Sequence, residues 1–233
     1  MEVQYRSDGK TGTFNSDFAV CTIPFSVLKN KKLAGFSREK MEGIATLNYA
    51  GGSKVLLHCR ERFWETKYGI FNGASVSDRL VRQVYYPSNN QKSQTSGVLL
   101  GSYTIGNDTR LLNGKSPEER LFIIKNNIGR FHPEMMQDNM IAGSMGVNWE
   151  EYRWTQGACS VLWDEENTDT TSSAKLTNLD HAIRRPEGHL FFAGEHCSDL
   201  KGWMEGAVIS ALDAVQDIYK KASEKVLWMN EVA

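Results

Sequence analysis

The chain has 233 residues, enough to bury a core in one large domain or in two small ones. Hydrophobic residues make up 40% and charged residues 24%, as in ordinary globular proteins, and the formal net charge is −1. We therefore expect no nucleic-acid partner, no membrane span and no signal peptide in this chain, and the sequence leaves its compartment unknown.

The four cysteines do not suggest a disulfide framework or a metal site. They are widely spaced and form no CxxC pair, so reduced thiols are expected; they are Cys21, Cys59, Cys159 and Cys197. The five histidines form no HExxH motif or close pair. We therefore expect no metal ion.

The first elements read as a hairpin followed by two helical segments. Residues 3–6 predict a strand that turns at Asp8-Gly9, and residues 18–22 predict the second, mostly apolar strand. Pro24 ends that strand and starts a short helical turn. Ser37 is the expected N-cap of a helix that runs to about residue 47.

Strands dominate the middle of the chain. Residues 53–60 contain more apolar than polar side chains, which predicts a strand covered on both faces. Residues 82–87 and 96–106 predict two further strands, separated by a polar loop at 88–95.

The clearest helix start in the sequence is Ser116-Pro117-Glu118-Glu119. It combines a hydroxyl N-cap, proline at the first helical position and glutamate at the third. An apolar stripe of Leu121, Ile124 and Ile128 follows, and Gly129 ends the helix.

The last third predicts a loop, a short strand and a long helix. Residues 164–175 are acidic and rich in Ser and Thr, which favours a solvated loop. Residues 189–194 predict a strand, and residues 204–222 predict a helix. The apolar residues of this helix fall at helical spacing, so one of its faces should be buried. They are Val208, Ala211, Leu212, Val215, Ile218 and Tyr219.

Strands and helices alternate without the strict βαβ order of a doubly wound sheet. An α/β or α+β chain with a mixed sheet is the expected class. One further motif, AGSMG at 142–146, is similar to the nucleophile elbow of serine hydrolases. No apolar helix follows it, so that chemistry is not expected.

The segment FFAGEHCSDLKGWMEGAVISALDAV, residues 191–215, carries the strongest functional signal. Gly194 lets the backbone turn tightly after a short strand, and the following helix points its N-terminus back toward that turn. Free N–H groups and the positive end of the helix dipole favour a ligand with negative charge. On physical grounds alone, a plain strand–loop–helix with an exposed Trp203 fits equally well.

This segment resembles the C-terminal flavin-binding signature of the flavin-dependent amine oxidases. Gly202-Trp203 is similar to the L-amino-acid oxidase branch, since monoamine and polyamine oxidases usually carry glycine-tyrosine there. The resemblance extends over about residues 1–222 in the same order, through SDFAVCTIP, GSKVLLHCRERFWETKYGIFNGA, VYYPSNN, GVLLGSYTIGND and WEEYRWTQGA.

The resemblance implies that the cofactor is FAD. Gly194 and Glu195 would contact its ribityl–pyrophosphate region, and the N–H of Met204 would donate to the flavin O2. Trp149 would stack near the isoalloxazine ring. A core aromatic with a satisfied polar tip is the alternative for Trp149.

Four residues would act on the substrate if the resemblance holds. Trp203 would pack over the substrate, and the Gly202 carbonyl would accept from its amino group. Lys54 would hold a water near flavin N5, and Tyr103 would donate to the substrate carboxylate. From the residues alone, Lys54 could instead extend along an apolar strand to solvent, and Tyr103 could be a core aromatic.

Cys159 raises the question of a covalent flavin. Monoamine oxidases carry a flavin-linking cysteine after a glycine pair, and Gly157-Ala158-Cys159 follows Trp149 at nearly that spacing. The L-amino-acid oxidases bind FAD without a covalent bond, so a small buried thiol is the expectation.

The family pattern also implies a missing part. We find no GxGxxG pattern of the kind that a dinucleotide-binding unit needs, and in the family that unit is N-terminal, as is the arginine that pairs with the substrate carboxylate. The chain is therefore expected to be the C-terminal half of an oxidase. Residues 1–47 and 184–225 would belong to the FAD-binding domain, and residues 48–183 would form the substrate-binding domain.

The activity implied is oxidation of an L-amino acid by O2, giving H2O2, a 2-oxo acid and ammonia. The partner would be the missing N-terminal half or subunit, and a homodimer is left open. Amine oxidation of the polyamine or monoamine oxidase type is the alternative activity. A non-catalytic remnant or interaction module is the alternative to an enzyme.

Overall fold

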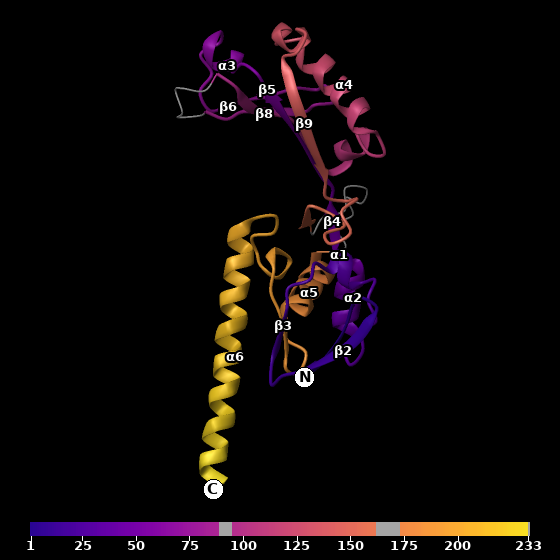
Figure 1. Ribbon diagram of the computed structural model, residues 1–233. Coiled ribbons are helices and arrows are strands. Elements are labelled where there is room, and N and C mark those ends of the chain that lie inside the picture. Colours follow the sequence, from indigo (N-terminus) through magenta and orange to yellow (C-terminus); the bar gives the residue numbers. More distant parts are fainter. Residues whose placement is uncertain (89–94, 162–172, 233) are drawn as a thin grey trace. The chain divides into compact units, whose positions relative to one another are not determined.

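The computed structural model describes residues 1–88, 95–161 and 173–232, which form two compact units (Figure 1). The first unit consists of residues 1–49 and 159–233, and the second consists of residues 50–158. Each contains both strands and helices, so the mixed α/β class expected from the sequence is confirmed. The domain roles inferred from the resemblance stay predictions.

The first unit joins both ends of the chain. Its strands are β1 (Glu2–Ser7), β2 (Lys10–Asn15), β3 (Ala19–Cys21), β4 (Asn48–Ala50), β10 (Cys159–Val161) and β11 (Leu190–Phe192). Its helices are α1 (Phe25–Leu28), α2 (Arg38–Thr46), α5 (Ser173–Arg184), the 3-10 turn η4 (Glu195–Cys197) and α6 (Met204–Val232).

The parallel pair β3–β11 lies between two layers of helices in this unit. Successive side chains of a strand point to opposite faces, and Phe191 and Phe192 follow that rule. Phe192 packs in a core with residues of α1, α2 and α5, including Phe25, Ile44 and Ile183. Phe191 packs with Ala214 of α6 on the other side. Burial of these two rings therefore joins the N-terminal and C-terminal segments.

The predicted N-terminal hairpin has a different second strand. The turn at Asp8-Gly9 is confirmed, but β1 pairs with β2, residues 10–15, in antiparallel register. Residues 19–21 form β3, whose partner is β11 from the far end of the sequence. The hairpin prediction was wrong here because the turn at Asp8-Gly9 pairs the adjacent segment, residues 10–15, whereas the more apolar and partly buried β3 pairs with β11.

Two features near the C-terminus also differ from expectation. Residues 164–172 lie outside the described residues, but Ser173–Lys175 open helix α5 and do not belong to a loop. Helix α6 extends to Val232, beyond the predicted end at residue 222.

The buried face of α6 differs from the predicted one, and of the predicted apolar residues Ile218 alone is half-buried and packs against Phe191, Ala193 and Ala214. Val208, Leu212 and Tyr219 are 54%, 64% and 73% exposed, whereas Gly206 and Ser210 are buried along with Ala214. Small residues at four-residue spacing let the helix approach the strands closely, so the larger apolar side chains are left outside.

The second unit is built on one antiparallel sheet. Its strands are β5 (Gly52–Cys59), β6 (Gly73–Val76), β7 (Gln83–Tyr86), β8 (Gly97–Ile105) and β9 (Ile141–Asn148), in the order β6-β7-β8-β5-β9. Its helices are α3 (Phe63–Thr66), α4 (Pro117–Ile128) and the 3-10 turns η1 (Gly106–Leu111) and η2 (Pro133–Met136). The AGSMG motif lies inside β9, in extended backbone and not at a strand-to-helix turn.

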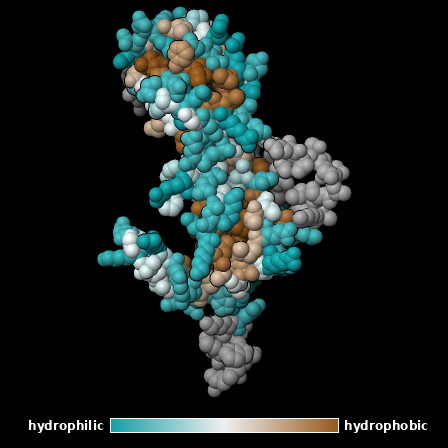
Figure 2. Space-filling model, turned by 90° about the vertical axis from the view of Figure 1, so that its right-hand side faces the viewer, coloured by the Kyte–Doolittle hydropathy of each residue, from teal (hydrophilic) through white to brown (hydrophobic). Residues whose placement is uncertain are grey.

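Among the described residues of the second unit, a core packs on one face of this sheet. Val55, Leu57 and Cys59 of β5 pack in a core with Ile124 and Ile128 of α4, which lies along the sheet (Figure 1). On the other face Leu56 and His58 are exposed, so the prediction of a strand covered on both faces was wrong. Figure 2 shows hydrophobic surface among hydrophilic side chains on each unit.

The local helix signals of the sequence were accurate. Ser37 caps α2 through the Lys40 N–H, and Ser116 and Glu119 form a reciprocal capping box at the start of α4. Such caps satisfy N–H groups that have no partner within the helix and contribute about 1 kcal/mol each. Gly129 follows the last residue of α4 as predicted.

Candidate functional site

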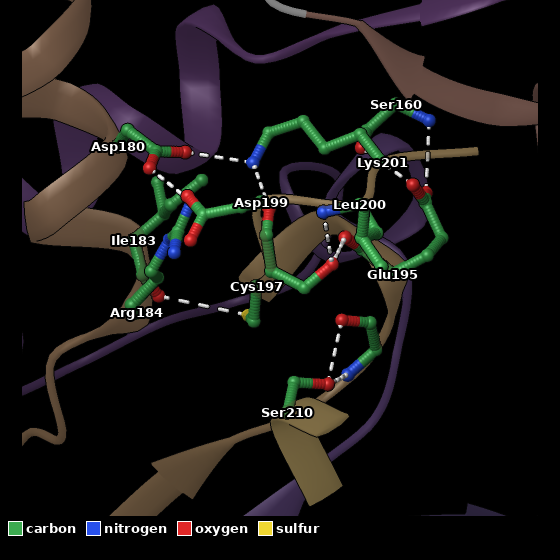
Figure 3. A network of polar contacts seen from close by, with 12 residues as sticks. Ser160, Asp180, Ile183, Arg184, Glu195, Cys197, Asp199, Leu200, Lys201 and Ser210 are labelled. Atoms are coloured by element: carbon green, nitrogen blue, oxygen red, sulfur yellow. Dashed lines mark hydrogen bonds and ion pairs between the residues drawn. The ribbon is translucent and has the colours of Figure 1, made fainter. Parts of the chain in front are cut away.

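The glycine turn after β11 is held by a serine of α6. The N–H of Gly194 donates to Ser210 Oγ at 2.9 Å, and the same hydroxyl donates to the Gly194 carbonyl at 2.8 Å (Figure 3). Gly194 has φ of 143°, a conformation that favours glycine. Its peptide groups are therefore engaged within the protein, and the turn is fixed to the helix.

Glu195 is the polar centre of the loop that leads to α6. Its Oε1 accepts from the Ser160 N–H at 2.8 Å, and its Oε2 accepts from Ser160 Oγ at 2.8 Å and from the Gly202 N–H at 2.7 Å. Ser160 belongs to β10, so the carboxylate joins a strand to the far end of the loop; its contacts with Ser160 are drawn in Figure 3.

The middle of the loop is tied to α5 by charged side chains. Lys201 Nζ lies 2.7 Å from Asp180 Oδ1 and donates to the Ser198 carbonyl at 2.8 Å. Arg184 pairs with both Asp180 and Asp199 (Figure 3). The Lys201 and Asp180 side chains are only 9% and 15% exposed, so this pair is screened less than a surface pair. Contacts from α5, β10 and α6 therefore hold the loop in one conformation.

The loop ends at the start of α6, where the packing is tight on one side and open on the other. A Cβ at Gly206 would lie 2.2 Å from the Leu200 carbonyl oxygen, so the helix packs directly on the loop backbone. Trp203 and Met204, in contrast, are 70% and 89% exposed. The first N–H groups of an α-helix have no partner within the helix and are suited to an electron-rich acceptor.

His196 is buried beneath the same turn. Its ring packs on Phe25 with centroids 4.5 Å apart, and a Cβ at Gly194 would lie 2.4 Å from its Cε1. His196 Nε2 has no hydrogen-bond partner among the residues that the structure describes. Burial, together with the charges of Lys201 and Lys40, lowers the pKa of His196 to about 4.

We expect this histidine to make the first unit sensitive to acid. The folded chain keeps the imidazole neutral, whereas the unfolded chain binds a proton near the ordinary pKa of 6.5. The unfolded state thus binds more protons, and stability falls as the pH drops from 6.5 to about 4, by about 3 kcal/mol in all. Urea unfolding at stepped pH should show this loss. In His196→Phe the slope of the unfolding free energy against pH should correspond to about one fewer proton taken up on unfolding. Equal slopes for the two proteins would exclude His196 as the cause.

In the second unit, Lys54 and Tyr103 are directly opposite each other on β5 and β8. Lys54 Nζ lies 4.8 Å from the centroid of the Tyr103 ring. The row that contains them continues to Val147 on β9 and Gln83 on β7. The structure thus brings these two predicted residues together on the uncovered face of the sheet.

An apolar row lies beside this pair. Met145, Leu56, Leu100 and Tyr85 are neighbours across four strands, and Met145 is 70% exposed. A ligand with an apolar part would find both a cationic side chain and hydrophobic surface on such a face.

Trp149 lies at the edge of the same face. It follows β9, and its N–H donates to the Gly52 carbonyl at 2.9 Å. A Cβ at Gly52 would lie 3.4 Å from Trp149 Cδ1, and Gly52 shares its face of β5 with Lys54. The predicted residues therefore fall into two groups. Lys54, Tyr103 and Trp149 lie in the second unit, and the others lie in the first.

Cys159 lies against the loop near Gly202. A Cβ on Gly202 would be 3.6 Å from Cys159 Sγ, and burial and the nearby Glu195 both raise the pKa of the Cys159 thiol. The protonated thiol is a weak nucleophile. All four cysteines are free thiols.

Two other kinds of site are absent from the described ranges. Among these residues, no group of three or more His, Cys, Asp or Glu side chains is arranged to bind a metal ion. Nor does any described helix combine the length and apolar character that a membrane crossing requires.

Sequence reasoning missed the residues that hold the loop in place. They are Ser160, Asp180, Lys201 and Ser210. Their partners are up to 35 positions away in sequence, and no local pattern reveals such pairs. Gly206 did carry a signal, since a glycine inside a helical pattern often marks close packing.

Comparison with known proteins supports the assignment of this architecture. The family model for flavin-containing amine oxidoreductases matches residues 2–219. The flavin-dependent L-tryptophan oxidase RebO of Lentzea aerocolonigenes is 42% identical over 206 residues, which are 88% of this chain and 42% of that protein. The L-amino-acid oxidase of Siganus canaliculatus is 32% identical over 186 residues, covering 79% of this chain and 33% of that protein.

A solved structure shares the fold. Cyclohexylamine oxidase from Brevibacterium oxydans IH-35A matches with a TM-score of 0.72 at 18% identity, over 95% of this chain and 46% of that one. The chain thus spans less than half of the length of each of these relatives. From the family match over nearly its whole length, the chain belongs to the flavin-containing amine oxidoreductases, whose cofactor is FAD.

Proposed function

We propose that this chain is part of an L-amino-acid oxidase and supplies one side of its flavin site and much of its substrate site. The observation that carries the proposal is the turn at Gly202–Met204, which is fixed by Glu195 and exposes the first residue of a long helix. The relatives at 42% and 32% identity, named as L-tryptophan and L-amino-acid oxidases, favour an amino acid over a simple amine.

The residues of the first unit fit a flavin. The N–H of Met204 lies at the positive end of the α6 dipole, where it can donate to the flavin O2 as negative charge develops there. Gly194 and Glu195 would lie beside the ribityl–pyrophosphate region. A bound FAD would supply the acceptor for the hydride of the substrate Cα, and its reoxidation by O2 would yield H2O2.

The remaining residues would bind and orient the amino acid. The Gly202 carbonyl accepts from the substrate amino group, and Trp203 covers the substrate. Tyr103 donates its hydroxyl to the carboxylate, Lys54 holds a water beside the reacting bond, and Trp149 packs beside the flavin ring. The imino acid that leaves is hydrolysed to a 2-oxo acid and ammonia. These protein residues contribute orientation of the substrate and stabilisation of charge.

The proposal also concerns domains and partners. Residues 1–47 and 184–225 would complete an FAD-binding domain, and residues 48–183 would form the substrate-binding domain. The dinucleotide-binding unit would come from an N-terminal half or a separate subunit. Peroxide release by the assembled oxidase, measured with L-tryptophan, other L-amino acids and amines without a carboxylate, tests the substrate class. Turnover of the simple amines alone would reject the L-amino-acid assignment.

Tyr103→Phe should raise KM for L-amino acids in the assembled oxidase. The change removes one hydrogen bond to a charged carboxylate, an effect of roughly 1.5–3 kcal/mol, or about ten- to hundredfold. Amines without the carboxylate should hardly respond. Tyr85→Phe is the matched control, because its ring lies 6.3 Å from that of Tyr103 and its hydroxyl donates to Gln83. Equal losses with both kinds of substrate would favour a packing role for Tyr103.

FAD should be held without a covalent bond. Burial and Glu195 keep the Cys159 thiol protonated, which disfavours thioether formation. Acid precipitation of the assembled oxidase should therefore release all of the flavin into the supernatant. Flavin that remains with the wild-type precipitate but not with that of Cys159→Ser would establish a thioether instead.

A further inference from the structure

The carboxylate of Glu195 accepts hydrogen bonds from three donors, two on a distant strand and one at the far end of its own loop. Ser160, 35 positions away, donates through both its N–H and its hydroxyl, and Gly202 donates its N–H at 2.7 Å. Hydrogen bonds to an ionised acceptor are about twice as strong as those between neutral groups. Glu195 therefore acts as a clamp between β10 and Gly202, the last residue before Trp203; Figure 3 shows its contacts with Ser160.

Gly202 is a place where such a clamp matters. It is exposed, and its φ of 80° lies in the left-handed region. An exposed glycine in a loop is free to adopt many conformations, and fixing one has an entropic cost. The charged ties of Lys201 reach α5 through Asp180 and hold the preceding residue, but the Gly202 peptide itself is held by Glu195.

The position of that peptide decides where the next groups point. The Gly202 carbonyl, the Trp203 ring and the Met204 N–H follow it directly in the chain, and Trp203 and Met204 are largely exposed. An error of about 1 Å in such groups can cost a hundredfold in rate. The groups to which the proposed function gives substrate and flavin contacts thus depend on a carboxylate that is itself occupied by protein donors.

We propose that Glu195 is a positioning residue for the Gly202–Met204 turn, with Ser160 as its anchor, and that its carboxylate is not primarily a ligand of the cofactor. What the turn does rests on the proposed function. The clamp itself does not, and it can be measured in the chain of residues 1–233 without flavin.

The first test is amide hydrogen exchange of the whole chain, followed by NMR. In the wild-type protein the Gly202 amide should be protected although the residue is exposed. Glu195→Gln places an NH2 group where one carboxylate oxygen accepts, so either Gly202 or Ser160 loses its acceptor. We expect the amide that loses its acceptor, Gly202 or Ser160, to exchange roughly ten- to hundredfold faster in this variant. Ser160→Ala removes one bond of the anchor and should have a smaller effect in the same direction.

Ser210→Ala is the matched control, because it releases the Gly194 amide and makes no bond to Gly202. It should speed exchange at Gly194 and leave Gly202 protected. A Gly202 amide that exchanges in the wild-type chain as fast as in an unfolded peptide would overturn the clamp, even if Glu195→Gln failed to fold. Unchanged exchange of both the Gly202 and the Ser160 amides in a folded Glu195→Gln chain would overturn it too.

The second test separates positioning from cofactor binding in the assembled holo-oxidase. A positioning role predicts that Glu195→Gln keeps its FAD but loses roughly tenfold or more in kcat/KM. A ligand role predicts loss of FAD, which would overturn the proposal. If the exchange results support the clamp and no assembly binds flavin, the proposed function fails while the clamp stands.

Discussion

Residues 1–233 expressed alone should be colourless, should release no peroxide from L-amino acids and should tend to self-associate. The groups proposed to meet FAD reach only part of a dinucleotide, and the sequence holds no GxGxxG pattern for its other end. Affinity changes tenfold for every 1.4 kcal/mol, so the loss of about half of a ligand's contacts removes many decades. Absorbance in the flavin band and a coupled peroxide assay measure this directly.

Self-association of the chain is expected because large apolar side chains are exposed to solvent. Val208, Leu212, Val215 and Tyr219 line the outer face of α6, and Met145 and Val76 lie on exposed strands of the second unit. Contiguous exposed apolar surface of this kind usually marks an interface or an aggregation hazard. Light scattering at several concentrations should show it, and it should decrease when a partner covers these faces.

The N-terminal half of a closely related oxidase, added in trans, should restore colour and activity. That half alone must stay colourless for the result to count. A yellow, peroxide-producing monomer of residues 1–233 would refute the view that this chain needs a second half. A complex that forms without flavin would point to the non-catalytic alternative.

Gly206→Ala should destabilise the first unit by about 2 kcal/mol or more, although alanine is the better helix former by about 1 kcal/mol. The added Cβ would lie 2.2 Å from the Leu200 carbonyl oxygen and 2.3 Å from Ser198 Oγ. Most of this clash is with backbone, which cannot move without displacing the loop. In the assembled oxidase we therefore also expect a loss of activity, since Trp203 and Met204 follow the same loop.

Chemical denaturation followed by far-UV circular dichroism measures the change. Ala211→Gly, at an exposed position of the same helix, calibrates the intrinsic helix preference and should cost about 1 kcal/mol. A Gly206→Ala protein as stable as wild type would mean that α6 can shift away from the loop without penalty. The tight contact would then have no energetic role.

Local signals in the sequence were enough for helix starts, turns and family. Ser37 and Ser116 cap their helices as predicted, Asp8-Gly9 makes the turn, and the segment from Phe191 to Val215 identifies the flavin amine oxidases. The caps and the turn depend on residues within a few positions of one another, and the family signature lies in one continuous segment. A single stretch of chain is therefore enough to predict them.

Only the tertiary structure decided which elements meet and which faces are covered. The partner of residues 19–21 is a strand about 170 positions later, and no local sequence pattern predicts that pairing. The periodicity of α6 predicted a buried face of Val208, Leu212 and Tyr219, yet the helix packs through Gly206, Ser210 and Ala214. Small residues give a weak hydrophobic signal but allow the closest approach of backbones. Likewise the glutamate that the family signature suggests as a cofactor contact is hydrogen-bonded to Ser160 and Gly202, because a half-buried carboxylate takes the nearest donors that the fold supplies.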